Sequence, residues 1–566
     1  MEVRGYYWWC WFGALLTLAT LLGGTQGATQ GSTGRRFTAA VLEHAVLLPP
    51  TRAQGTLPTR AEALTLMHSN LDIMEPLIHK AASMGADIVV SPEDGLYGWT
   101  LSREEAQFYM EDILDPSTQL GWVPCEQPPS IASPPPPPPL HRASANDPEP
   151  GSVLSRLSCL ARNLSVYLVA NLGDGKECDR GSDPRCPPDS RYQFNTDVVL
   201  DRLGRLVGRY HKYRLFMGED QFDQPAEPTQ VIVETDFGRL GVFTCFDILF
   251  RAPAVQLVEE GAVDTVLFPT AWMNVLPHLS AVQFHSAWAM GMAVNMLAAN
   301  THNTTNRMTG SGIYSPDGAR AYHYDTVTGS GHLLLADLDV SPRAPGYQRP
   351  DWGRHASALA PPSPGASSPP SFTADVFHDP FTMVLLAAGA GNASVCHGEL
   401  CCHLEFATEA AEEPRAAGEL HALGAFSGLH VVEGQYYLQI CTLLKCAGAE
   451  KETCGHSTEE AATRFSRFSL SGTFGTRHVF PEVLLSGVDL APGQFQVLDD
   501  GRLMNSDVGL QGPPLSVTLF GRWYERDEGD CCGGGPGSIG RVRWQVAMLG
   551  LCTAALAMLL TGVAMR

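Results

Sequence analysis

The chain has 566 residues, of which 44% are hydrophobic, and its formal net charge is −22. This length exceeds what one hydrophobic core supports, so two or more folded domains are expected. Nucleic acid is excluded as a partner, because the acidic chain lacks the clustered basic residues that phosphate contacts require. The net negative charge is explained by its contribution to solubility.

The first 27 residues have the pattern of a secretory signal peptide. Arg4 precedes an apolar stretch at residues 6–22, and small residues follow at 24–27. Such a segment is removed during export, and the alternative, a retained signal anchor, is less favoured. The mature chain is therefore expected in an oxidising compartment. Three Asn-x-Ser/Thr sequons agree with export and are predicted glycosylation sites: Asn163, Asn303 and Asn392.

The cysteine count indicates disulfides and one thiol without a partner. Of 15 cysteines, Cys10 lies in the predicted signal peptide and Cys552 in an apolar C-terminal tail, which leaves an odd number, 13. Cys245 has the most apolar, strand-like setting and is the best candidate to stay free. Cys178 and Cys186 bracket a short loop in which they can pair. The C-terminal third holds a cluster in which a disulfide framework is favoured over zinc: Cys396, Cys401, Cys402, Cys441, Cys446 and Cys454.

The N-terminal third alternates strands and helices in the manner of an α/β domain. Residues 37–46 predict a strand, and residues 60–85 carry apolar side chains at helical spacing and end at a glycine. Residues 86–91 predict the next strand, so the order is βαβ. This strand runs into Glu93, a carboxylate at a strand end. Taken alone, such an acid is more often a loop residue or a helix cap.

A proline-rich insert at residues 123–150 interrupts this pattern. Its proline run favours an exposed polyproline conformation, as a surface loop or, less favoured, as a site for a proline-binding partner. After the insert, residues 153–162 predict a helix and residues 164–170 a strand. Residues 192–212 then predict a hairpin that Lys212 closes. A lysine in this position is more often simply solvated.

The next hairpin leads to Cys245. Apolar residues between 231 and 243, broken by a turn at 236–238, predict a buried strand whose tip carries this thiol. Ligands are usually held at the open edge of an α/β sheet, so a thiol at this position can be a nucleophile. The alternative is a buried structural thiol. The rest of the domain is predicted to contain helices at 252–261 and 279–292 and strands at 265–272 and 294–300. Two further strands are expected to close the sheet.

Beyond a Pro-, Ser-, Ala- and Gly-rich linker at residues 357–372, residues 377–520 alternate short apolar runs with glycine turns. They predict a mostly β module, and no catalytic constellation stands out in it. Residues 546–565 then form an apolar stretch of 20 residues. As a transmembrane anchor this stretch conflicts with the positive-inside bias, because Arg541 and Arg543 would lie outside. A GPI-attachment signal is favoured, with attachment at Gly533, a ten-residue spacer at 536–545 and the apolar tail.

Glu93, Lys212 and Cys245 each end a predicted strand of one domain, so they are expected to meet at one sheet edge. Together they suit acyl transfer by a thiolate. The carboxylate can act as general base and then as general acid, and the ammonium can stabilise the oxyanion. The backbone N–H of Phe246 can complete an oxyanion hole.

At these residues the chain resembles the nitrilase (carbon–nitrogen hydrolase) superfamily, in its vanin and biotinidase branch. The matching stretches are PEDGLYGW at 92–99, RYHKY at 209–213, FTCFDIL at 243–249, FPTAWMNVLP at 268–277, FHSAWAMG at 284–291 and MTGSGIY at 308–314. Past the linker, the matches are CCH at 401–403, GQYYLQIC at 434–441 and FSLSGTFG at 468–475. The proline insert departs from the pattern of this branch.

The resemblance implies an α/β fold of the four-layer αββα nitrilase type, followed by a mostly β, disulfide-containing domain. The expected boundaries are a signal peptide at 1–27, a catalytic domain at 35–345, a linker at 346–373, a vanin-type base domain at 374–525 and a GPI signal at 526–566. Glu93 would be the base, Lys212 the oxyanion-stabilising cation and Cys245 the nucleophile, with no cofactor or metal. Many nitrilases carry a supporting glutamate near the lysine, which makes Glu219 an additional candidate.

The branch implies two substrates, pantetheine and biocytin. Both are secondary amides, so the triad does not separate them. Residues 284–290 and the GPI-like tail are more similar to vanins, so hydrolysis of pantetheine at the outer cell surface ranks first, with biotinidase activity as the alternative. A catalytically silent cell-surface binding protein is a third hypothesis, which the complete triad disfavours.

Overall fold

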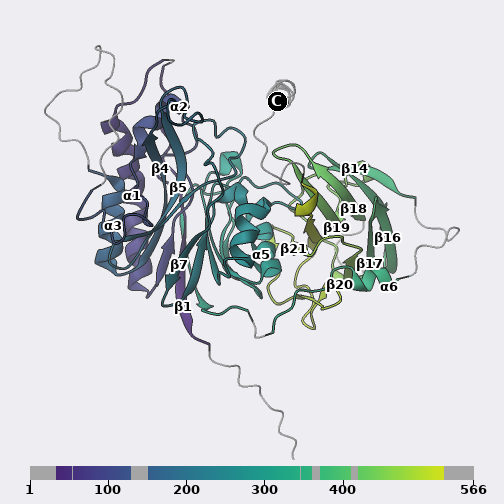
Figure 1. Ribbon diagram of the computed structural model, residues 1–566. Coiled ribbons are helices and arrows are strands. Elements are labelled where there is room, and N and C mark those ends of the chain that lie inside the picture. Colours follow the sequence, from purple (N-terminus) through teal and green to yellow (C-terminus); the bar gives the residue numbers. More distant parts are fainter. Residues whose placement is uncertain are drawn as a thin grey trace, which may run out of the picture.

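The computed structural model describes residues 34–53, 55–128, 151–343, 346–359, 370–409 and 418–527. The predicted signal peptide, the proline run and residues 528–566 of the predicted GPI signal, with Gly533, lie outside these ranges. Within them, no helix combines the length and the hydrophobicity needed to cross a bilayer. Figure 1 shows two bodies side by side, an α/β body formed by the N-terminal part of the chain and a β-rich body formed by the C-terminal part.

Two mixed sheets form the α/β body. The first has the order β13-β1-β2-β4-β5-β6, with β3 paired to β4, and the second has the order β12-β11-β10-β9-β8-β7. The strands of the first sheet are β1 (Arg36–Glu43), β2 (Ile88–Val90), β3 (Met110–Glu111), β4 (Tyr167–Glu177), β5 (Arg191–Leu200), β6 (Leu206–His211) and β13 (His332–Asp339). Those of the second sheet are β7 (Val231–Thr235), β8 (Gly238–Val242), β9 (Thr265–Thr270), β10 (Asn295–Asn300), β11 (Ser311–Ser315) and β12 (Gly318–His323).

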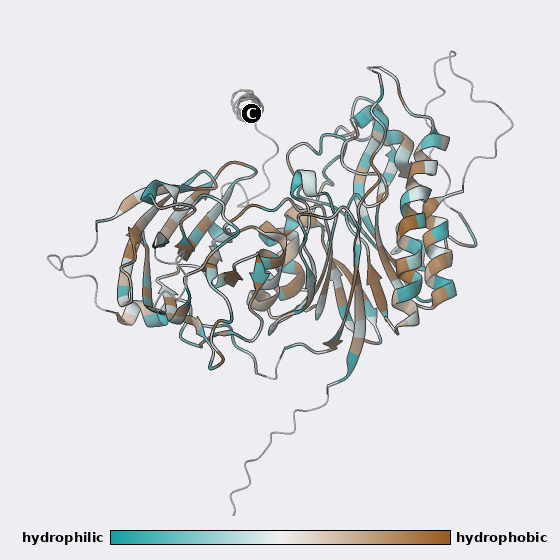
Figure 2. Ribbon diagram, turned by 180° about the vertical axis from the view of Figure 1, so that it is seen from behind, coloured by the Kyte–Doolittle hydropathy of each residue, from teal (hydrophilic) through white to brown (hydrophobic). Residues whose placement is uncertain are grey.

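Helices cover the outer faces of this pair of sheets, which gives the expected αββα layers. Helices α1 (Arg60–Ser83) and α3 (Val153–Leu164) pack on the first sheet, and α5 (Ala281–Met292) packs against β11 of the second. The helices carry both hydrophobic and hydrophilic residues (Figure 2). Strand β1 is apolar on both faces because each face is buried in a different hydrophobic core. Ala40 and Leu42 join the core under α1 and α3, while Ala39 and Val41 point into the core between the sheets.

The β-rich body is a sandwich of two further sheets, with the orders β14-β15-β18-β19-β25-β21-β22 and β16-β17-β20-β24-β23. The first comprises β14 (Phe372–Val376), β15 (Asp379–Leu385), β18 (His421–His430), β19 (Tyr436–Lys445), β21 (His478–Leu485), β22 (Asp489–Leu490) and β25 (Pro514–Arg522). The second comprises β16 (Ala390–His397), β17 (Leu400–Thr408), β20 (Phe465–Gly472), β23 (Phe495–Val497) and β24 (Leu503–Asn505). Before this sandwich, part of the predicted linker forms a short helix, α6 (Arg354–Ala358).

The cysteines pair as a local framework, as the sequence predicts. Disulfides join Cys396 to Cys401, Cys402 to Cys441, Cys446 to Cys454, and Cys178 to Cys186. The bridge from Cys402 in β17 to Cys441 in β19 connects the two sheets of the sandwich. A fifth bridge, Cys125–Cys159, was not predicted and joins the beginning of the insert to α3. Among the described residues, Cys245 is the free cysteine.

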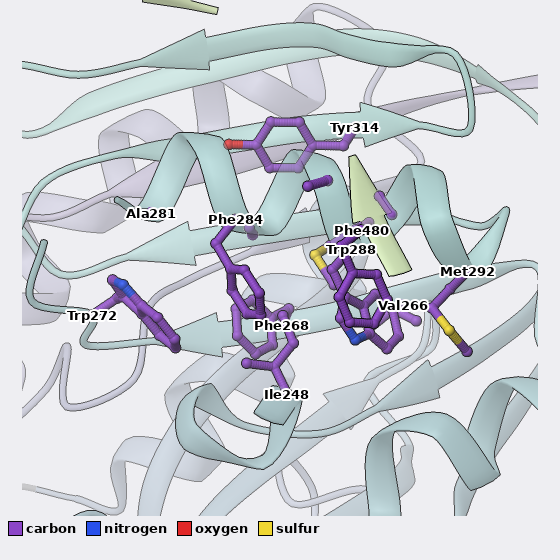
Figure 3. Close-up of a cluster of buried hydrophobic side chains, with 14 of the residues drawn as sticks. Ile248, Val266, Phe268, Trp272, Ala281, Phe284, Trp288, Met292, Tyr314 and Phe480 are labelled. Carbon is purple, nitrogen blue, oxygen red and sulfur yellow. The ribbon is translucent and has the colours of Figure 1, made fainter. Parts of the chain in front are cut away.

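Helix α5 is buried between the second sheet and the β-rich body. Figure 3 shows its side chains Phe284 and Trp288 among aromatic residues of the sheet and Phe480 of β21. The ring of Phe284 lies 6.1 Å from that of Phe480, and the ring of Trp288 lies 6.4 Å from it. A Cβ atom on Gly291 would come within 2.6 Å of Phe480, so this glycine permits the close approach of β21. The two bodies therefore share one packed core.

Two predicted elements differ in the structure. The helix expected at 252–261 is divided into a π-helical segment, Arg251–Val255, and a single α-turn, α4 (Gln256–Glu259). Strand β4 begins at Tyr167 and extends to Glu177, into the stretch expected to be a loop. In all, β4 pairs with β5 along ten residues, and this long hairpin ladder satisfies the backbone groups that a loop would leave to solvent.

Candidate active site

Glu93 and Lys212 form a buried ion pair at the carboxyl ends of their strands. Glu93 follows β2 and Lys212 follows β6 directly, and their side chains are 2% and 1% exposed. The Lys212 Nζ donates a hydrogen bond of 2.7 Å to Glu93 Oε1. The other carboxylate oxygen, Oε2, accepts the backbone N–H of Ala271, at the end of β9, at 2.9 Å. Both sheets thus hold the Glu93 carboxylate.

Two asparagines of the first sheet orient this carboxylate further. Asn195 in β5 donates from Nδ2 to Glu93 Oε1 at 2.8 Å. Asn171 in β4 donates in turn to Asn195 Oδ1 at 2.7 Å, and its own Oδ1 accepts the N–H of Asp94 at 3.1 Å. From the second sheet side, the Thr301 hydroxyl donates to the Glu93 carbonyl at 2.6 Å. Side chain and backbone of Glu93 are therefore both fixed.

Glu219 is the second carboxylate on Lys212. Its Oε2 accepts from Lys212 Nζ at 2.7 Å and from the Phe216 N–H at 2.5 Å, while Oε1 accepts from Asn195 at 3.1 Å. The additional candidate from the sequence therefore lies in the same cluster as Glu93 and Lys212. Burial disfavours the charged form of Lys212, but the negative charges of Glu219 and Glu93 together hold its pKa well above the usual value.

Cys245 lies at a sharp turn just past β8. Its φ of 46° falls in the left-handed region, which a non-glycine residue adopts at a cost in free energy. The residue begins a short 3₁₀ helix, Cys245–Leu249. Burial raises the pKa of the thiol well above its usual value, as does the charge of Glu93, while Lys212, Thr270 and the Ala271 N–H lower it. The thiol is therefore neutral at rest and close to a carboxylate that can remove its proton.

A buried clamp connects the Cys245 turn to the Lys212 segment. Asp247 accepts the Arg214 N–H at 2.8 Å, the Tyr210 hydroxyl at 2.7 Å and the Thr244 N–H at 3.1 Å. Tyr210 and Arg214 lie on either side of Lys212 in the sequence, and Thr244 directly precedes Cys245. The Asp247 side chain thus fixes the segment that carries Lys212 against the turn that carries Cys245.

A second buried aspartate supports the same turn. Asp197 in β5 accepts the Thr244 hydroxyl at 2.6 Å and the Asn171 Nδ2 at 2.8 Å. Burial raises the pKa of Asp197 to about 7, with the Thr244 and Asn171 hydrogen bonds opposing the shift. Burial likewise raises the pKa of Asp247 to about 7, opposed chiefly by the Tyr210 hydroxyl.

Reasoning from the sequence predicted roles for Glu93, Lys212, Cys245 and Glu219 but missed the residues that orient them. These are Asn171, Asn195, Asp197, Tyr210 and Asp247. One signal was available, because Gln193, Asn195 and Asp197 alternate in a strand that ends in an apolar run. Alternate residues share one face of a strand, so this pattern marks a polar face inside a core.

The three sequons lie in different settings. Asn163 is exposed near the end of α3, and Asn392 is exposed in β16. Asn303 is half-buried, and its Oδ1 accepts the Asn306 N–H at 3.0 Å. A glycan at Nδ2 leaves that oxygen contact available.

Comparison with known proteins follows the two bodies of the structure. Residues 63–344 match the family model described as carbon–nitrogen hydrolase, and residues 371–527 match the model of the vanin C-terminal domain. The pantetheinase of Homo sapiens is 54% identical over 491 residues, which cover 87% of this chain and 90% of that protein. The pantetheinase of Mus musculus is 51% identical over 524 residues, covering 92% and 94%. The biotinidase of Takifugu rubripes is 40% identical over 539 residues, covering 91% and 99%.

Similarity of this extent covers the site as well as both bodies. The chain therefore belongs to the carbon–nitrogen hydrolase family, within its vanin branch.

Proposed function

We propose that the chain is an amidohydrolase that cleaves pantetheine to pantothenate and cysteamine through a thioester on Cys245. The observation that carries the chemistry is the buried contact between Lys212 and Glu93 beside a free, buried thiol. The choice of substrate rests on similarity, since pantetheinases are up to 54% identical to the chain and a biotinidase is 40% identical.

Acylation begins with the neutral thiol. As Cys245 Sγ attacks the amide carbonyl carbon, Glu93 takes the thiol proton. The carbonyl oxygen becomes an oxyanion, which the Lys212 ammonium and the Phe246 N–H stabilise. When the C–N bond breaks, the protonated Glu93 returns the proton to the nitrogen, so cysteamine leaves as a neutral amine and the pantothenoyl group stays on Cys245 as a thioester.

Deacylation uses the same groups with water as the nucleophile. Glu93, again a carboxylate, takes a proton from water, and the resulting hydroxide attacks the thioester carbonyl. The second oxyanion collapses with loss of the Cys245 thiolate, which recovers a proton from Glu93. The product is pantothenic acid, which releases its proton to solvent and leaves as pantothenate. Neither half-reaction requires a metal, a cofactor or a histidine.

The test is to measure hydrolysis of pantetheine and of biocytin by the purified protein, with Cys245→Ala as the control. We expect release of cysteamine, a preference for pantetheine in kcat/KM, and no turnover by the variant at an unchanged melting temperature. Preference for biocytin would move the assignment to biotinidase. Hydrolysis of neither amide by the wild type would favour another amide substrate or the silent binding protein.

We further propose that the protein is exported, glycosylated at Asn163, Asn303 and Asn392, and held on the outer cell surface by a GPI anchor near Gly533. This proposal rests on the sequence patterns at the two termini and on the sequons. A phosphatidylinositol-specific phospholipase should release the protein from intact cells, and retention after treatment would favour a transmembrane tail. Digestion with an N-glycosidase should lower the apparent mass, and the loss should diminish stepwise when each asparagine is replaced by glutamine.

A further inference from the structure

The C-terminal body contacts the short helix that carries the nucleophile. Arg522, the last residue of β25, is fully buried, and its Nε donates 2.8 Å to the carbonyl of Leu249. Leu249 is the final residue of the Cys245–Leu249 helix. The contact joins residues that are 273 positions apart in the chain. It therefore reaches the end of the helix that begins at Cys245.

Arg522 is itself rigidly held. Its two terminal nitrogens donate to the Asp527 carboxylate at 3.1 and 2.6 Å, and one of them also donates to the Tyr437 carbonyl at 2.6 Å. The guanidinium lies over the rings of Tyr436 and Tyr524. Asp527 balances its charge, so Arg522 acts on the helix as a fixed donor. A planar fork can serve Leu249, Tyr437 and Asp527 together, and a lysine ammonium cannot.

A second contact reaches the residue after the nucleophile. Gly434 of the C-terminal body lies so close to Phe246 that a Cβ atom there would be 3.0 Å from the phenyl Cζ. The Phe246 ring also packs on Phe216 and Phe250, at 5.2 Å from each. Phe216 in turn gives its N–H to Glu219. The position of Phe246 is thus set jointly by both bodies, and its N–H is the proposed oxyanion donor.

These contacts explain how the turn at Cys245 keeps its unfavourable φ of 46°. Such a conformation persists only when the surrounding structure fixes it. Before the cysteine, Asp197 and Asp247 hold Thr244. After it, the helix end is held from the other body. We propose that the C-terminal body positions the nucleophile, with Arg522 as the positioning residue for Cys245 and the Phe246 N–H.

The inference rests on the proposed amide hydrolysis, and the test has one arm that needs no substrate. The variant is Arg522→Lys, which keeps the charge but loses the fork. We expect kcat for pantetheine, per folded molecule, to fall by about 10- to 100-fold, with KM changed less than about threefold, as for a misplaced reacting group. The apparent pKa values of the pH–rate profile should stay in place, because Asp527 already neutralises Arg522.

The substrate-independent arm is the rate at which iodoacetamide alkylates Cys245, followed by mass spectrometry of the peptide that contains it. This rate should change in Arg522→Lys by at least about threefold, as the thiol is displaced from Glu93. If the wild type hydrolyses neither pantetheine nor biocytin, the proposed function fails while the alkylation rate still decides the role of Arg522. Unchanged kcat and unchanged alkylation in a folded Arg522→Lys protein would overturn the inference.

A pair of glycine variants decides the question if Arg522→Lys does not fold. Gly434→Ala pushes on Phe246, whereas Gly428→Ala places a Cβ atom at the same 3.0 Å from a phenyl Cζ, that of Phe426, within the C-terminal body. Both glycines are half-buried, and neither has a positive φ. We expect Gly434→Ala to lower kcat at least about threefold more than Gly428→Ala does. Equal effects of the two substitutions would overturn the inference.

Discussion

Replacing Asp247 with asparagine tests whether the clamp between the Cys245 turn and the Lys212 segment supports catalysis. The carboxylate accepts three hydrogen bonds, two of them, from Tyr210 and Thr244, at Oδ2 and one, from Arg214, at Oδ1. An asparagine of the same shape has one accepting oxygen. If that oxygen keeps the two bonds on the Oδ2 side, its NH₂ group faces the Arg214 N–H, and two donors oppose each other.

The size of the effect follows from this lost bond. A buried donor without an acceptor costs about 1–3 kcal/mol. Relief of that cost moves the Arg214 backbone, two residues from Lys212, away from the Cys245 turn. If the whole amount appears in the transition state, kcat/KM falls between about 5-fold and 150-fold, since about 1.4 kcal/mol corresponds to a factor of ten. The assay is hydrolysis of pantetheine at pH 8, above the pKa of about 7 that burial gives Asp247.

The matched control is Asp201→Asn, in the turn between β5 and β6, at the opposite end of β6 from Lys212. Asp201 is also buried, and its Oδ1 accepts the backbone N–H groups of Leu203 and Arg205 at 2.9 Å each. It contacts no residue of the site. We expect Asp201→Asn to lower the melting temperature while kcat/KM per folded molecule stays within about twofold of the wild type. If Asp247→Asn behaves in the same way, the clamp serves stability alone and the reasoning is refuted.

Three further predictions use the same structure. Glu219→Gln removes one of the two carboxylates bound to the catalytic lysine and should lower kcat by about 10-fold or more, with unchanged kcat arguing against a supporting role. Because the pKa of Asp197 rises from 3.8 to about 7 on burial, the folded state holds more protons between these values. The unfolding free energy of the wild type, relative to that of Asp197→Asn, should therefore fall as pH rises from about 4 to 7, by at most about 1.4 kcal/mol per pH unit. Urea titrations of both proteins at several pH values measure this difference. The same pH dependence in the two proteins would contradict the prediction. Replacing both Cys125 and Cys159, 34 residues apart, with serine should cost roughly 3–4 kcal/mol of unfolding free energy at unchanged kcat, and an unaltered denaturation midpoint would show that the bridge contributes nothing.

Most of the α/β elements could be predicted because their signals are local. Helix α1 follows its apolar spacing and begins at Thr59, whose side chain and Glu62 form a capping box. The hairpin of β5 and β6 follows from two apolar runs around a turn. By contrast, the regular helix expected at residues 252–261 disregarded a local signal, Pro253. A proline disfavours helical angles at the residue before it, and Ala252 has a φ of −104° and a ψ of 124°.

The amino-acid sequence by itself determined an α/β first domain and a mostly β second domain, because the periodicity of short stretches indicates strands and helices. Its short motifs carry the resemblance to the family, and that resemblance implied the αββα layers and predicted reacting roles for Glu93, Lys212 and Cys245. Only the tertiary structure decided how those groups are held. Asn195 on Glu93, Asp247 between Lys212 and Cys245, and Arg522 on Leu249 are contacts between residues distant in the chain. Such contacts form where strand ends and the two bodies come together in space. Local sequence patterns do not predict which distant residues will be brought into contact.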